Sequence, residues 1–288
     1  MNGEHIPVLL GHVIDNLVGA GSRLFIDATI GGGGHAYHIL ERYKDIRVIG
    51  IDIDKDALEI AQRRLWLFKD RVTLVRGNFR DLKAILKTRG VSSFDAILFD
   101  LGLSTYQLMG NRGFSFHSEG PLDMRMDQRE KLTAYDVVNR YTYGMLYSIL
   151  KNFGEEKKAS RIARMIVEER KKKPIATAEA LSSVVCKVKK RRGRIHPATQ
   201  TFQAIRMEVN NELHNIEAGI HGAIDMLLPG GRIGIISFHS LEDRLVKNIF
   251  RNSPGLHINT KKPITPDMVE VRNNPRARSA KLRIAEKV

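Results

Sequence analysis

The chain has 288 residues, 42% of them hydrophobic, and its 47 Lys and Arg against 32 Asp and Glu give a formal net charge of +15, which points to a polyanionic partner. This length suffices for one large core, or for a core and a smaller second one, so we expect one or two domains. The N-terminal stretch has no basic region and is interrupted by His12 and Asp15, and no other stretch approaches twenty unbroken apolar residues, so we expect neither a signal peptide nor a membrane span, and a cytoplasmic location.

Apolar runs and amphipathic segments alternate through the first third of the chain. The strand-like runs cover 23–30, 47–53, 72–77 and 94–102. The helix-like segments between them cover 35–43, 55–68 and 80–89, and Asp54 is available to cap the second of these. Strand, helix and strand at these spacings predict right-handed βαβ units. The expected fold class is therefore α/β, with a parallel, Rossmann-like sheet.

The alternation stops after residue 107 and resumes with a strand-like run at 227–238, a helix-like segment at 240–250 and a final strand-like run at 280–288. The simplest interpretation is a sheet domain formed by 1–107 and 215–288, interrupted by an inserted domain at 108–214. We expect the insert to be helical, with helices within 144–150, 156–173 and 176–188. One long helix over 199–228 should then lead back to the sheet, with an apolar stripe that packs in the core.

The insert is the most basic part of the chain. It carries 21 Lys and Arg against 12 Asp and Glu, a net charge of +9. Its densest basic segment is KVKKRRGRIHP, residues 187–197. A run of this kind is often only a solvated loop, but in a basic insert beside a predicted active site, contact with phosphates is the better interpretation.

The single cysteine, Cys186, excludes an internal disulfide and a multi-cysteine metal site. Its apolar neighbours indicate a buried thiol on a helix. We expect no metal, because His35 and His38 have no evident third ligand.

The stretch DATIGGGGHA, residues 27–36, places four glycines between a predicted strand and a predicted helix. Glycines at such a turn let the backbone approach a ligand closely. A phosphate loop of the Walker type is excluded, because His35 and Ala36 stand where Lys and Ser or Thr are needed. Asp27 lies four residues before Gly31, and this D-x-x-x-G-x-G pattern favours S-adenosylmethionine (SAM) over a nicotinamide cofactor.

Acidic and aromatic residues follow the next strands in the order that a SAM site requires. Asp52 ends the second strand, where a carboxylate can bind the ribose diol. Phe79 can stack on adenine or pack in the core, and Asp81 nearby can accept a hydrogen bond from the adenine amine. Asp100 ends the fourth strand, at the edge where open α/β sheets bind ligands. Together with the glycine turn, these positions favour a SAM-dependent methyltransferase.

Several long segments resemble the bacterial 16S rRNA cytosine-N4 methyltransferases of the MraW type, over about residues 5–285. These segments are HIPVLL, DATIGGGGH, FDLGLS, RGFSF, PLDMRMD, FGEEKKASRIAR, IHPATQTFQAIRMEVNNEL, PGGRIGIISFHSLEDRLVK and NPRARSAKLR. The resemblance implies methylation of the exocyclic N4 of a cytidine in the decoding region of 16S rRNA, by a methyltransferase core with an inserted helical domain. One departure is Gly32, where relatives often have a larger residue.

The resemblance also implies the residues and partners of the site. The implied SAM contacts are Gly33, Gly34, His35, Asp52, Phe79, Asp100 and Gln107. The implied partner is 16S rRNA or the small ribosomal subunit, with no membrane, and a homodimer is a further option.

Our candidates for the methyl transfer are Asp100 near the donor, Asp123 orienting the target amine, and His239 on the loop after the fifth strand of the parallel sheet. The segment DLGLS lacks the Asp/Asn-Pro-Pro-aromatic motif of many amino-methyltransferases. Asp123 has an alternative role in pairing with Arg125, and His239 one as a structural histidine. Replacing Asp123 or His239 with Ala is expected to remove turnover while SAM affinity stays nearly intact.

Two other functions stay open at this point. One is methylation of a different nucleic acid such as tRNA or DNA, because the basic insert would bind any phosphate backbone. The other is a non-catalytic ribosome-assembly factor on a decayed methyltransferase fold, which the intact acidic and glycine positions disfavour.

Overall fold

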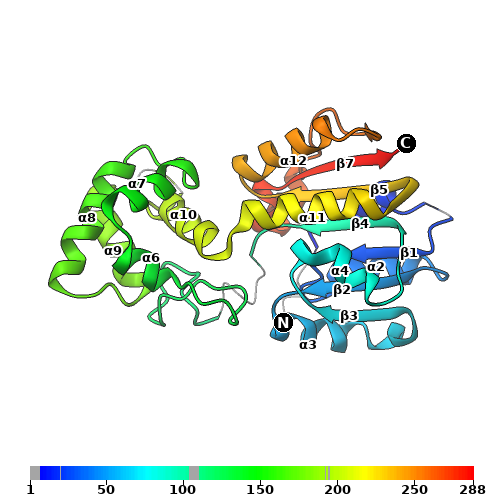
Figure 1. Cartoon of the computed structure of the whole chain (residues 1–288), viewed down its shortest axis with the longest axis horizontal. Coiled ribbons are helices and arrows are strands. Elements are labelled where there is room, and N and C mark those ends of the chain that lie inside the picture. Colours follow the sequence, from blue (N-terminus) through cyan, green and yellow to red (C-terminus); the bar gives the residue numbers. More distant parts are fainter. Residues whose placement is uncertain (1–6, 20, 104–109, 192, 194) are drawn as a thin grey trace. The chain divides into compact units, whose positions relative to one another are not determined.

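The chain is organised as two compact units. The computed structural model describes residues 7–19, 21–103, 110–191, 193 and 195–288. The sheet unit consists of Met1–Gly102 and Leu213–Val288, and the helical unit of Leu103–Glu212 (Figure 1). The helical unit thus begins at Leu103, where the sequence suggested 108, and ends at Glu212, where the sequence suggested 214.

A seven-stranded sheet in the order β3-β2-β1-β4-β5-β7-β6 forms the sheet unit, which confirms the predicted α/β class. The strands from β1 to β5 pair in parallel, whereas β7 runs antiparallel to both β5 and β6. The short β6 is the one strand that the sequence did not predict. The bounds are β1 (Leu24–Asp27), β2 (Arg47–Asp52), β3 (Val72–Arg76), β4 (Phe94–Asp100), β5 (Leu227–Ser237), β6 (Leu256–Ile258) and β7 (Lys281–Lys287).

Helices cover both faces of this sheet, because successive strand residues point to opposite faces. Phe25 belongs to an apolar cluster that includes residues of α1 (Leu10–Leu17), α2 (Gly34–Arg42) and α3 (Lys55–Arg64). Its neighbour Ile26 belongs to a second cluster, which includes residues of α4 (Leu82–Lys87), α11 (Glu212–Met226) and α12 (Ser240–Asn252). The sheet is therefore wound on both sides, which places ligands at the carboxyl ends of its parallel strands.

Three predicted helices are shorter than the sequence indicated. The segment 55–68 ends as α3 at Arg64, and a 3-10 helix, η1 (Trp66–Arg71), follows. The segment 80–89 divides into η2 (Phe79–Asp81) and α4. The long helix expected at 199–228 breaks at Asn211, whose left-handed φ of 49° ends α10 (Thr199–Asn210) before α11 begins. Asn adopts this left-handed conformation more readily than most residues. The spacing of apolar residues, from which the helix was predicted, carries no information on a single backbone angle.

The remaining helices of the sheet unit lie near the C-terminus, and the sequence did not predict them. They are α13 (Met268–Asn273) and the 3-10 helix η3 (Pro275–Ser279). In the part of the chain that the structure describes, no helix combines the length and apolar character needed to cross a membrane.

Helices also make up most of the regular structure of the helical unit. Beside α10 it contains α6 (Ala134–Arg140), α7 (Tyr143–Asn152), α8 (Ala159–Lys172) and α9 (Ala178–Val188), of which only α6 was not expected. Three of them, α6, α7 and α9, begin with a threonine cap: the hydroxyls of Thr133, Thr142 and Thr177 accept hydrogen bonds from backbone N–H groups in the first turn of each helix. Their apolar faces meet in a separate core.

The prediction of a buried thiol at Cys186 is wrong. Val184 and Val185 are buried on α9, but Cys186 is exposed. Each helical residue turns the chain by about 100°, so a residue beside a buried stripe can face solvent although its sequence neighbours are apolar.

Candidate active site

The glycine turn connects β1 to α2 and depends on backbone conformations that glycine adopts without strain. Gly31 and Gly33 have positive φ angles of 50° and 78°, and Gly33 occupies the N-cap of α2. A Cβ on Gly33 would lie 3.1 Å from Leu65 Cδ1, and one on Gly34 would lie 2.7 Å from Pro7 Cγ. The glycines therefore allow α2 to begin close to the neighbouring chain segments.

Asp52 ties the end of β2 to this turn. Its Oδ2 accepts a hydrogen bond from Gly31 N at 2.8 Å, and its Oδ1 accepts one from Asp54 N at 2.9 Å. Burial raises the pKa of Asp52 to about 6, although these backbone hydrogen bonds oppose the rise. The carboxyl group is thus fixed at the carboxyl end of β2, as a ribose-binding residue requires.

Asp27 and Asp100 end the neighbouring strands β1 and β4. Burial raises the pKa of Asp27 to about 7, and the charge of Asp52 contributes. Burial likewise raises the pKa of Asp100 to about 8, with contributions from the charges of Asp27 and Glu242. Asp100 Oδ1 is buried and accepts no hydrogen bond within the described part of the chain.

These acidic groups fit the chemistry of SAM, which carries a positive sulfonium and an amino-acid ammonium group. Buried carboxyl groups with raised pKa values are stabilised in their ionised form by a nearby cation. The buried Asp100 Oδ1 is an acceptor that still needs a donor. The observed residues therefore suit a cationic ligand at the carboxyl ends of β1, β2 and β4.

His35 lies in the first turn of α2 and is buried. Its Nε2 donates to the Val8 carbonyl at 3.0 Å, because a carbonyl only accepts, and its Nδ1 lies 3.8 Å from Asp100 Oδ2. His38 instead lies 3.5 Å from Glu41 Oε2 on the exposed side of the helix. The two histidines thus make separate contacts.

Phe79 begins η2 and packs against the core, which is one of the two arrangements that the sequence allowed. Its half-buried ring packs edge-on against Phe99, with centroids 5.6 Å apart. Asp81 extends into solvent and lies 3.4 Å from Arg80 Nε, so its side chain takes part in a surface ion pair. Gln107, the last of the implied SAM contacts, lies outside the described residues.

Asp123 belongs to the helical unit and forms a two-pronged ion pair with Arg125. Arg125 Nε and Nη2 donate to its two oxygens at 2.7 and 2.8 Å. Burial acts to raise the pKa of Asp123, but the hydrogen bonds and charge of Arg125 outweigh it and hold the pKa below its ordinary value. The pairing that the sequence left as an alternative is therefore present.

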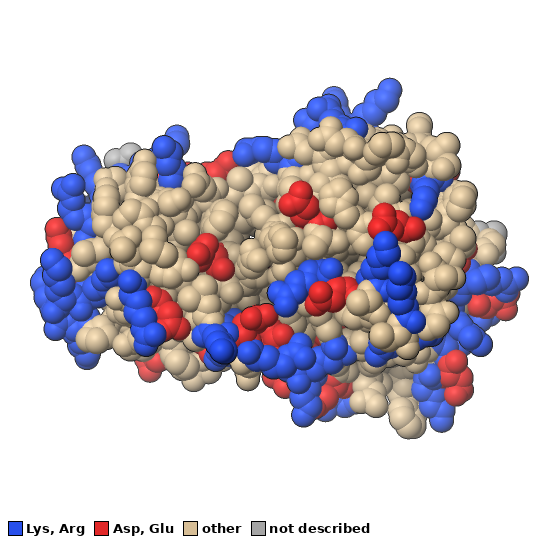
Figure 2. All heavy atoms as spheres, in the orientation of Figure 1, with Lys and Arg blue, Asp and Glu red and all other residues tan. Residues whose placement is uncertain are grey.

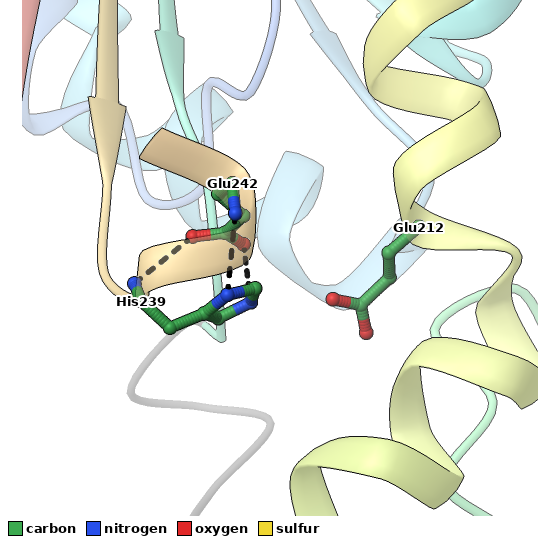
Figure 3. A group of neighbouring side chains, drawn as sticks. All are labelled: Glu212, His239 and Glu242. Atoms are coloured by element: carbon green, nitrogen blue, oxygen red, sulfur yellow. Dashed lines mark hydrogen bonds and ion pairs between the residues drawn. The ribbon is translucent and has the colours of Figure 1, made fainter. Parts of the chain in front are cut away.

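His239 and Glu242 form the N-terminal cap of α12 (Figure 3). The Nδ1 of His239 accepts from Glu242 N at 3.4 Å, while Glu242 Oε2 accepts from Phe238 N at 2.8 Å and from His239 N at 3.4 Å. The His239 Nε2 atom lies 3.1 Å from Glu242 Oε1. His239 therefore has the structural role that the sequence offered as its alternative, close to a carboxyl group whose charge reaches Asp100.

Sequence reasoning missed two residues of this site. Thr29 Oγ1 accepts a hydrogen bond from Asp100 N at 2.7 Å and so joins the ends of β1 and β4. Glu242 is almost fully buried and acts on Asp100 electrostatically. The spacing of His239 and Glu242, three residues apart before an amphipathic helix, is a capping pattern that indicates Glu242, whereas no sequence signal singles out Thr29.

The basic character of the chain is visible on its surface. Figure 2 shows Lys and Arg side chains over both units on the face drawn, with Asp and Glu between them. In the basic segment of the helical unit, Lys187 and Lys189 pair with Glu169 and Glu156. Lys190 and Arg191 are exposed and form no ion pair with the described residues, so their charge is available to a ligand.

Known proteins resemble this chain along its whole length. A ribosomal RNA small subunit methyltransferase H from Persephonella marina is 52% identical, with 99% of each chain covered. A protein of the same name from Thermotoga neapolitana is 49% identical, covering 99% of this chain and 96% of its own.

A solved rRNA methylase structure from Streptococcus thermophilus is far more distant. It is 12% identical, covers 97% of this chain and 93% of its own, and has a TM-score of 0.46. The profile of the MraW methylase family matches residues 2–288. With this match and close full-length relatives, the chain belongs to the MraW methylase family.

Proposed function

We propose that this protein transfers the methyl group of SAM to the exocyclic N4 of a cytidine in the decoding region of 16S rRNA. The observation that carries the proposal is the buried acceptor Asp100 Oδ1, among carboxyl groups that suit a cation and beside the glycine turn. The names of the relatives, ribosomal RNA small subunit methyltransferase H, support rRNA as the substrate. The small subunit would be the partner and the cytoplasm the location.

As a member of this methylase family, the chain is a methyltransferase with SAM as its cofactor. When bound, SAM supplies a methyl group activated by its positive sulfonium. We assign Asp52 to the ribose diol and Phe79 to the adenine. The remaining implied contacts are Gly33, Gly34 and His35 near the amino-acid end, Asp100 near the sulfonium, and Gln107.

Asp100 is the residue that we place beside the methyl-accepting amine, cytosine N4. The lone pair of cytosine N4 is delocalised into the ring, so catalysis requires a fixed approach and an acceptor for the N–H groups. Asp100 Oδ1 provides such an acceptor, held by the hydrogen bond from its own backbone N–H to Thr29. The new N4–C bond forms as the bond between the SAM sulfur and its methyl group breaks, which would leave the neutral thioether S-adenosylhomocysteine. N4 must also lose a proton, and the ionised Asp100 Oδ1 is the atom that we assign to accept it.

Asp123 and His239 remain our further candidates for orienting the amine. Each also has a structural contact, the Arg125 pair for Asp123 and the α12 cap for His239. A test of either residue must therefore measure folding and turnover together.

The helical unit is proposed to bind the RNA around the target. Its net charge favours a phosphate backbone, and Lys190 and Arg191 are the exposed cations that we assign to it. The target cytidine must leave its stack to reach the site, at a cost of about a few kcal/mol unless it is already unpaired.

The test is transfer of labelled methyl from SAM to 16S RNA, offered naked and within small subunits from cells that lack this activity, with mass spectrometry of the product nucleoside. N4-methylcytidine is the expected product, and Asp100→Asn is expected to abolish it. SAM binding without transfer to either substrate would overturn the target. Transfer at another atom or to another nucleic acid would overturn the site specificity.

A further inference from the structure

Trp66 and Leu67 are exposed at the point where α3 ends earlier than its sequence pattern predicts. Phe68 departs from helical geometry within η1, and its ring turns inward against Tyr37, with centroids 5.5 Å apart. Leu65 is buried, whereas Trp66 and Leu67 are 62% and 80% exposed. The break in the helix therefore divides four consecutive apolar residues between core and solvent.

Two adjacent large apolar side chains in water need an explanation that a single exposed residue does not. Trp66 is the only tryptophan of the chain. Within the described residues it makes no ring contact with another aromatic side chain, and the Nζ of Lys69 lies 5.1 Å from its ring centroid. The indole thus presents an aromatic surface with a cation beside it.

Exposed cations flank these two residues in the sequence, Arg63 before them and Lys69 after them. Arg63 and Lys69 are exposed, and neither forms an ion pair with the part of the chain that the structure describes. Arg71, in contrast, donates to the carbonyls of Leu40 and Tyr43 and is committed to the fold. The cations left at the surface complement a polyanion.

The same segment adjoins the glycine turn within the sheet unit. A Cβ on Gly34 would lie 3.3 Å from Arg64 Nη1, and one on Gly33 would lie 3.1 Å from Leu65 Cδ1. Trp66 therefore follows directly on residues that contact the turn assigned to the cofactor. An RNA strand that leaves a base in that site on the side of α3 passes over this surface of the same unit.

We propose that Trp66 and Leu67, with Arg63 and Lys69, form a surface that binds the single-stranded RNA flanking the methylated base. The inference rests on the proposed function, because it takes RNA as the substrate. Exposed aromatic rings bind unpaired bases by stacking, and neighbouring cations bind the phosphates. Charge complementarity favours RNA over a second copy of this chain, which would bring a like-charged surface to this one.

The single tryptophan makes the surface directly observable. A single-stranded oligoribonucleotide of about ten nucleotides is expected to quench the fluorescence of Trp66, as stacked bases do. Polyphosphate of matched charge is expected to bind without equal quenching. Equal quenching by polyphosphate, or none by RNA, would overturn the proposal. So would an emission change on dilution of the protein alone, which would assign the surface to a second copy.

Steady-state kinetics separate this surface from the catalytic site. Trp66→Ala is expected to raise the KM for 16S RNA about tenfold or more. Trp66→Phe keeps an aromatic ring, so its KM should lie close to that of the wild type. Both variants should leave SAM affinity unchanged. Met268→Ala removes another exposed apolar side chain of the sheet unit and should change neither constant. An unchanged KM in Trp66→Ala would refute the surface while the wild type still methylates RNA. A wild type that methylates no RNA would instead refute the proposed function, and the fluorescence titration would still decide whether the surface binds RNA.

Discussion

The carboxyl groups at the strand ends are placed where folding alone would not favour them. Within the described residues, no Lys or Arg pairs with Asp27, Asp52 or Asp100, and burial raises the pKa of each. Buried acidic groups of this kind lower the stability of the empty protein, and a bound cation offsets that loss. The cluster is therefore better explained by a cationic ligand than by the needs of the fold.

This arrangement predicts that SAM binding releases protons near neutral pH. In the empty protein the pKa values are about 7 for Asp27 and about 8 for Asp100, so at pH 7 both carry protons part of the time. A bound cation favours the ionised forms, so affinity should rise as the pH increases from about 6 to 8 and then level off. Calorimetric titrations in buffers of different ionisation enthalpy measure the number of protons released. Asp100→Asn should release fewer, and an affinity that falls over this pH range would contradict the assignment.

His239 offers a way to separate a cap from a reacting group. Asn is also a good N-cap residue, so His239→Asn should keep the stability of α12 within about 0.5 kcal/mol. On our proposal that the imidazole orients the target amine, turnover should nevertheless fall at least about tenfold while SAM affinity stays the same. Thermal melts, SAM titrations and methyl-transfer rates on the same preparations check this. Full turnover in the variant would show that capping is the whole role of His239.

At the scale of elements, the fit between α11 and η2 determines where Phe79 lies. A Cβ on Gly219 would lie 2.8 Å from Phe79 Cδ2 and 3.0 Å from the Phe79 carbonyl oxygen. Only a residue without a side chain therefore lets the helix approach η2 this closely. The position of the ring assigned to adenine thus depends on a glycine that lies 140 residues later in the chain.

Gly219→Ala should accordingly weaken both packing and cofactor binding. We expect the free energy of unfolding to fall by about 1–3 kcal/mol, because a methyl group is forced into a filled space, and SAM affinity to fall with it. Gly222→Ala is the matched control on the same helix, since its Cβ would meet nothing closer than 3.8 Å and Ala favours a helix by about 1 kcal/mol. Urea denaturation and SAM titration of both variants test the difference. Equal stabilities would show that η2 yields to the extra methyl group.

For the molecule as a whole, charge and chemistry are distributed between two units. The sheet unit holds the glycine turn and the acidic strand ends, whereas the helical unit carries the densest basic segment. A basic surface attracts any nucleic acid, and its contribution weakens as salt is added. The proposed target therefore depends on more than the net charge.

Replacing Lys190 and Arg191 together with Ala should weaken RNA binding by a similar factor for all RNA sequences. The slope of log affinity against log salt concentration should shrink by about one to two units, because each phosphate contact contributes about 0.7 in single strands. Lys87→Ala, an exposed lysine of α4, is the control and should leave the slope nearly unchanged. Filter-binding assays over a range of salt concentrations measure this. An unchanged slope in the double variant would remove these two residues from the RNA-binding surface.

Local patterns in the sequence sufficed for the parallel strands, for most helices and for the acidic residues at the strand ends. These features depend on side-chain periodicity and on the rule that parallel strands present their carboxyl ends at one edge, and neither needs knowledge of distant contacts. The resemblance to MraW-type methyltransferases likewise came from contiguous segments, and the family match confirms it.

What only the tertiary structure decided involves contacts between distant segments and single backbone angles. The left-handed Asn211 broke a helix whose apolar stripe looked continuous, and the helix break after Arg64 exposed Trp66. Periodicity records which residues are apolar, but burial depends on the partner that each face meets. The link from Thr29 to Asp100 spans 71 residues, so no local pattern contains it, although it fixes the residue on which the proposed chemistry depends.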